Sequence, residues 1–116
     1  MLILDDVGKK SFLKLLYTTM IQDKILSDEE DNTLELIARE IFQLDDYEET
    51  NLKTPEKTAR EINKIKSDTA IINLVEILLY IAGKSEKKQV MAFLRSAFEN
   101  AAISADVKSK IMEMMG

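Results

Sequence analysis

Apolar residues recur along most of the chain at steps of three and four positions, which is the period of an amphipathic α-helix. The first such segment runs from about Val7 to Gln22, and the second runs from Asp28 to about Leu44. The apolar stripe of the first segment contains Phe12, Leu13, Leu16, Tyr17, Met20 and Ile21. The stripe of the second contains Leu34, Ile37, Ile41 and Leu44. We predict two amphipathic helices that pack through these stripes.

A third helix is predicted where Thr54 precedes Pro55, because threonine is a good N-cap and proline suits the first helical position. This helix should extend to about Lys66. Few of its residues are apolar, so we expect it to lie at the periphery of the fold. The acidic stretch before it, residues 45–49, is expected to form a loop or a short helical turn.

The segment from Thr69 to Ala82 is apolar on nearly every side, which is typical of a buried helix or a membrane span. At about 1.5 Å per residue it covers about 21 Å, less than the roughly 30 Å hydrocarbon core of a bilayer. It also contains Asn73 and Glu76. We therefore predict a central core helix, ended by Gly83 as the left-handed cap residue, and no insertion into a membrane.

Two further helices complete the chain, one capped by Ser85 and reaching about Glu99, and one capped by Ser104. The stretch 100–107 resembles 23–30 in keeping an aliphatic residue followed by serine, although Lys84-Ser85-Glu86 offers a competing way to draw a repeat.

The predicted fold class is all-α, a compact bundle of five to six helices forming a single domain over residues 1–116. Two related helix–turn–helix halves around the helix at 69–82 are one way to divide it. The residues that we expect to be buried are Leu16, Ile37, Leu74, Leu78 and Leu94.

Charge and composition argue against several classes of function. The net charge of −5 disfavours binding to nucleic acid and to anionic lipid, since both require a basic face. The chain has no histidine and no cysteine, so the usual catalytic bases, nucleophiles and soft metal ligands are missing. We expect a protein that is not an enzyme and needs no cofactor. The N-terminus lacks the basic start and apolar run of a signal peptide, so we expect a cytoplasmic protein.

Residues 23–31 form an acidic hinge between the first two predicted helices. Ser27 and Glu30 have the spacing of a capping box. Oxygen ligands suit hard cations, so Asp23, Asp28 and Glu30 are candidate ligands for Ca²⁺ or Mg²⁺, although the spacing is not that of an EF-hand. The alternative is that these acids only cap the helix and keep its end soluble.

The same region offers a surface for a protein partner. Glu29 and Asp31 add to its negative charge, and Tyr47 lies among the acids of residues 45–49, which makes it a candidate interface residue. The alternative is that these acids are a solvated connector.

The hinge resembles the motif of the TerB-like tellurite-resistance family, which reads roughly Asp-Gly-x-Ile/Val-Ser-x-x-Glu between two helices. Asp23, Leu26, Ser27 and Glu30 occupy its Asp, aliphatic, Ser and Glu positions, and Lys24 replaces its glycine. The resemblance covers residues 12–44 well and the second half of the chain only in outline.

This resemblance implies a helical bundle without enzymatic activity, linked to stress and tellurite resistance. It also implies that the acids at 23 and 30 bind a divalent cation. Our leading hypothesis is an interaction module that binds a protein partner through its acidic surface. Two alternatives are a Ca²⁺- or Mg²⁺-binding sensor and a toxin or bacteriocin immunity protein, since acidic bundles can neutralise basic toxins.

Overall fold

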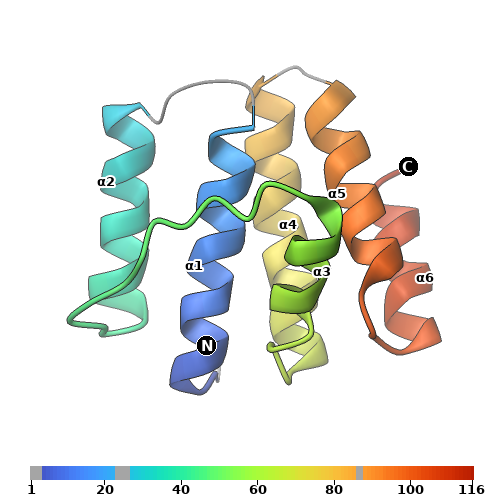
Figure 1. Ribbon diagram of the computed structural model, residues 1–116, viewed down its shortest axis with the longest axis horizontal. Coiled ribbons are helices and arrows are strands. Elements are labelled where there is room, and N and C mark those ends of the chain that lie inside the picture. Colours follow the sequence, from blue (N-terminus) through green and yellow to red (C-terminus); the bar gives the residue numbers. More distant parts are fainter. Residues whose placement is uncertain (1–3, 23–26, 86–87) are drawn as a thin grey trace.

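The described part of the chain folds into six α-helices and one π-helical turn, which confirms the predicted all-α bundle (Figure 1). The computed structural model describes residues 4–22, 27–85 and 88–116, and these ranges contain no strand. The elements in chain order are α1 (Asp6–Met20), α2 (Asp28–Leu36), the π turn η1 (Ile37–Ile41), α3 (Pro55–Ile62), α4 (Asp68–Ser85), α5 (Lys88–Asn100) and α6 (Ala105–Met114).

Four helices begin at side-chain N-caps, and three of these caps, at Ser27, Thr54 and Ser104, were predicted from the sequence. Asp5, Ser27, Thr54 and Ser104 each accept a hydrogen bond from the backbone N–H three residues further on. Such a bond satisfies one of the amides that the first helical turn leaves without a partner. These local signals therefore fix where α1, α2, α3 and α6 start.

Helix α1 is covered on several sides. It contacts α2, α3 and α4, and the segment between η1 and α3 passes across its remaining side (Figure 1). Its buried side chains therefore extend beyond one apolar stripe. They are Ser11, Phe12, Leu13, Leu15, Leu16, Thr18, Thr19 and Met20.

Helix α4 packs on α1, α5 and α6, and buries Leu74, Val75 and Leu78. Its other side reaches the surface, where Tyr80 is 65% exposed. The prediction that Gly83 ends this helix is wrong, because α4 continues to Ser85. The residues between Ser85 and α5, 86 and 87, lie outside the described residues, so the predicted cap of α5 stays a prediction. A helix can continue through one glycine at a cost of about 1 kcal/mol. None of the described helices is both long and apolar enough to cross a membrane.

Helix α3 lies at the front of the bundle in Figure 1 and buries one face, while Glu56, Lys57 and Arg60 are exposed. It packs against both α1 and α5, with Ala59 and Ile62 almost fully buried (Figure 1). A helix with few apolar residues can thus pack against two neighbours through one face.

Helix α2 passes into η1, and this π turn displaces the predicted apolar stripe. The Phe42 amide donates to the Ile37 carbonyl at 2.9 Å, a bond across five residues. Phe42 therefore reaches the core, where its ring packs edge-on against Phe12 with 5.3 Å between ring centroids. Ile41 is 59% exposed and Ile37 is half-buried, so the predicted burial of these two is wrong. The other four expected core residues, Leu16, Leu74, Leu78 and Leu94, are buried.

Candidate functional site

The start of α2 holds the predicted capping box. Glu30 N donates to Ser27 Oγ at 3.1 Å, and Ser27 N donates to the Glu30 carboxylate at 3.2 Å. The Glu30 carboxylate is thus turned back onto the helix end. Asp28 and Glu29 occupy the same first turn, both exposed, where the helix dipole favours negative charge.

The metal hypothesis named Asp23, Asp28 and Glu30. Asp23 lies outside the described residues. Within the described ranges, no group of three or more acidic side chains is arranged to hold a metal ion. Ca²⁺ or Mg²⁺ binding at the hinge therefore stays a prediction.

Residues 43–54, here called the crossing segment, connect η1 to α3 and run across α1 (Figure 1). Its attachment point is Thr18, a buried residue of α1. Thr18 Oγ1 donates to the Thr50 carbonyl at 3.2 Å and accepts from the Leu52 amide at 3.0 Å. One hydroxyl thus satisfies two backbone groups of an irregular segment, which fixes the segment against the bundle.

Thr18→Val should lower the free energy of unfolding by about 1–3 kcal/mol, because it keeps the side-chain shape but leaves the buried Leu52 amide without its acceptor. Urea denaturation followed by circular dichroism measures this change. Thr33→Val is the control, since the exposed Thr33 hydroxyl bonds only within its own helix. Equal stabilities for the two variants would show that Thr18 does not hold the crossing segment.

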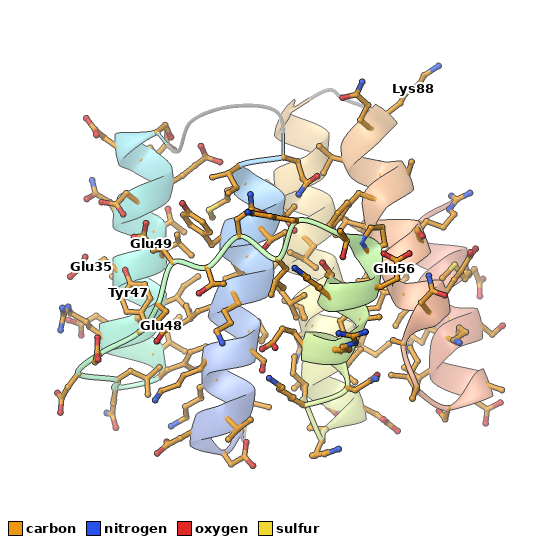
Figure 2. The ribbon with its side chains drawn as sticks, in the orientation of Figure 1. Glu35, Tyr47, Glu48, Glu49, Glu56 and Lys88 are labelled. Atoms are coloured by element: carbon orange, nitrogen blue, oxygen red, sulfur yellow. The ribbon has the colours of Figure 1, made fainter. Side chains whose placement is uncertain are left out.

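The crossing segment brings a second set of acids next to α2. Figure 2 shows Glu35 on α2, with Tyr47, Glu48 and Glu49 on the segment in front of it. Burial, a hydrogen bond with the Asp31 carboxyl, and the charges of Asp31 and Glu35 all raise the pKa of Glu49. The structure therefore gathers carboxylates from two elements that lie apart in the sequence.

Tyr47 lies within this acidic cluster but is half-buried, so it is less open than its sequence neighbours suggested. Burial raises the pKa of Tyr47, and the negative charges of Glu35, Glu49 and Asp31 raise it further. The structure thus brings together two of the predicted partner-binding residues, Asp31 and Tyr47.

Arg39 is one cation of this region. Its Nε donates to Glu35 at 2.6 Å, and one terminal nitrogen lies 3.5 Å from the Asp45 carbonyl. Both side chains of the ion pair are about half exposed, so the pair contributes little to stability. Lysines of α1 also approach this region: Lys9 Nζ donates to the Phe42 carbonyl at 3.2 Å, and Lys10 and Lys14 lie beside Asp46 and Glu48.

A cavity of about 100 Å³ lies beside Tyr47, between the crossing segment and α1. It is lined by Lys10, Lys14, Asp46, Tyr47 and Glu48. Small-molecule sites commonly enclose roughly 300–1,000 Å³ and are mostly apolar. This small cavity, with both signs of charge on its walls, does not have the character of a substrate pocket.

A buried carboxylate between α1 and α3 was missed by the sequence analysis. Glu61 accepts hydrogen bonds from Ser11 Oγ at 3.0 Å and from Lys64 Nζ at 2.7 Å, and Lys14 Nζ lies 3.8 Å away. The Lys64 spacing was visible in the sequence, but the contact with Ser11 joins positions fifty residues apart. Ser11 and Lys14 belong to α1, and Lys64 directly follows α3. We therefore interpret these polar contacts as a network that links α1 to α3.

Comparisons with protein-family models, with curated proteins and with solved structures find no match for this chain. The resemblance to the TerB-like family therefore depends on the hinge motif. Of its residues, Ser27 and Glu30 form the expected cap, whereas Asp23 and Leu26 lie outside the described residues.

Proposed function

We propose that this protein is a non-enzymatic module that binds a basic partner protein through an acidic edge. The acidic edge comprises the exposed or half-buried acids of α2, η1 and the crossing segment. These are Asp28, Glu29, Glu30, Asp31, Glu35, Glu40, Asp45, Asp46, Glu48 and Glu49.

The concentration of charge carries this proposal. Ten of the 21 acidic residues lie between Ser27 and Asn51, where Arg39 is the single basic residue. In the fold, α2 is at one side of the molecule with the crossing segment in front of it, so these acids share one region (Figure 1). Such a one-sided field steers a basic protein toward that region and raises its association rate.

The packing of Asp31, Glu35 and Glu49 supports the same proposal. Burial, a hydrogen bond with Asp31 and the negative charges of Asp31 and Glu35 raise the pKa of Glu49, so its negative charge is disfavoured here. Lysine or arginine side chains of a partner would stabilise that charge on binding. The TerB-like resemblance would place such binding in a stress-response assembly, and the immunity-protein alternative would make the partner a basic toxin.

Reversing charge on the acidic edge should abolish partner binding. The test variant combines Asp28→Lys, Glu29→Lys and Asp31→Lys, and its retention of proteins from a lysate of the native cells is compared with that of the wild type. We expect the wild type to retain a basic protein that elutes as salt is raised, and the variant to lose it.

A matched control separates surface charge from helix stability. Asp6→Lys, Glu56→Lys and Asp106→Lys also replace three acids in first helical turns, but in α1, α3 and α6. Both triple variants therefore carry the same net charge and a similar helix-dipole penalty. Binding that survives in the test variant, or is lost equally in the control, contradicts the proposal.

A further inference from the structure

The outer face of α2 and η1 exposes two large apolar side chains. Leu36 is 56% exposed and Ile41 is 59% exposed, whereas Leu34, Ala38 and Phe42 of the same two elements are buried. Burying such side chains in a complex is favourable in proportion to the apolar area removed from water. We define the outer face as residues 29, 32, 33, 36, 40 and 41, all of which are exposed.

The π turn is what places Ile41 on this face. In a regular α-helix, Ile41 would lie two turns after Leu34 and point toward the core. The bond from the Phe42 amide to the Ile37 carbonyl inserts one extra residue into the turn, so Phe42 takes the core position. Ile41 is thereby turned away from the core and is exposed, as Leu36 is, and π turns of this kind are frequent at functional sites.

Acidic side chains border the apolar pair. Glu29 precedes Leu36 by two helical turns, and Glu40 is adjacent to Ile41, both with exposed side chains. Glu35 is held by Arg39 on the neighbouring side of the helix. The outer face is thus an apolar centre with a negative border.

We propose that the outer face binds a basic amphipathic helix of the partner protein, with apolar residues over Leu36 and Ile41. Lysine or arginine residues that flank this apolar stripe would pair with Glu29 and Glu40. This inference rests on the proposed function and deepens it by naming the partner's secondary structure and charge pattern.

Charge complementarity selects this occupant over a second copy of the chain. A symmetric dimer through the outer face would bring the Glu29 and Glu40 carboxylates of one copy near those of the other. Like charges brought together at an interface cost free energy. An extended peptide is disfavoured because the described residues contain no sheet edge that could pair with it.

A synthetic peptide of leucine and lysine tests the inference directly. The probe is a fluorescein-labelled helix of about 18 residues, with leucine at helical spacing. A permuted peptide of the same composition, with leucine and lysine alternating, keeps the charge but not the helical stripe. We expect saturable binding of the helical probe by fluorescence anisotropy, and binding at least about tenfold weaker for the permuted one.

Variants of the protein locate the binding. Leu36→Ser with Ile41→Ser should raise the Kd for the helical probe about tenfold or more, while Val7→Ser should leave it unchanged. Val7 is a matched control because it is 55% exposed on α1. Leu36→Ala serves as a second variant that keeps helix propensity, and it should also raise the Kd.

Each other outcome overturns the inference in a recognisable way. Equal binding of both peptides would show that charge alone is recognised. If the apolar variants bind normally while the triple charge variant does not, the inference fails and the proposed function stands. If sedimentation shows a dimer that Leu36→Ser abolishes, the occupant is a second copy. If neither kind of variant changes binding, both proposals fail.

Discussion

Leu34→Ala should lower the free energy of unfolding by about 2–5 kcal/mol, whereas Leu36→Ala should change it by no more than about 0.5 kcal/mol. The two positions belong to the same helix, and the chemical change is identical. Leu34 is fully buried against α1, so its truncation removes buried area and leaves a cavity. Leu36 is mostly exposed in the free protein, so its truncation loses little. Urea denaturation followed by circular dichroism compares both variants with the wild type.

The difference between these two variants tests the register of α2. A similar loss at both positions would mean that Leu36 is buried in the free protein, and the outer face would then not be available to a partner. A negligible loss at Leu34 would mean that α2 is not packed on the bundle.

Glu61→Gln should lower the free energy of unfolding at pH 7 by about 1.5–3 kcal/mol, because it weakens hydrogen bonds made to a charged group. Burial by itself raises the pKa of Glu61, but hydrogen bonds from Lys64 and Ser11 and the charge of Lys14 lower it by more, so the net shift is downward. A carboxyl with a lowered folded pKa stabilises the fold above its unfolded pKa. That contribution is lost as the pH falls through the folded pKa.

The stability difference between wild type and Glu61→Gln should therefore be constant near neutral pH and shrink below about pH 4. Urea denaturation at a series of pH values measures it. The raised pKa of Glu49 acts in the opposite sense, but it cancels in this difference because both proteins carry it. Glu56→Gln is the control, since Glu56 is an exposed acid of the same helix. A difference that grows on acidification would contradict the assigned network.

Local features of the fold were predictable because they depend on residues that are close in sequence. The caps at Ser27, Thr54 and Ser104 each need only a hydroxyl and an amide three residues on. Helical periodicity also predicts the burial of Phe12, Leu13, Leu16 and Met20 in α1. The end of α4 could not be predicted from its glycine. A glycine ends a helix only where the chain beyond it leaves the helical path, and at Gly83 the helix continues.

The π turn could not be predicted from helical period. Periodicity assumes a constant rotation per residue, and η1 breaks this assumption between Ile37 and Ile41. One extra residue in the turn exchanges Ile41 for Phe42 in the core, and so creates the exposed apolar pair with Leu36. The outer face is therefore a consequence of a local irregularity that the apolar pattern concealed.

The candidate site was predictable in composition but not in arrangement. The acids of α2 and the crossing segment are evident in the sequence. Asp31 is a predicted partner-binding residue because of its charge, and Tyr47 because it lies among acids. That Glu49 would meet Asp31 depends on the path of the crossing segment over α1. This path is fixed by Thr18, whose bonds to Thr50 and Leu52 span more than thirty residues.

The most direct test of the acidic edge is an amide NMR titration of the ¹⁵N-labelled protein with the helical leucine–lysine peptide. We predict chemical-shift changes concentrated between residues 27 and 51, saturating with the peptide and diminishing as salt is raised. The amides of α5 and α6 should change little. Shifts concentrated on α5 and α6, or no saturable shift at low salt, would contradict the acidic edge as the binding surface.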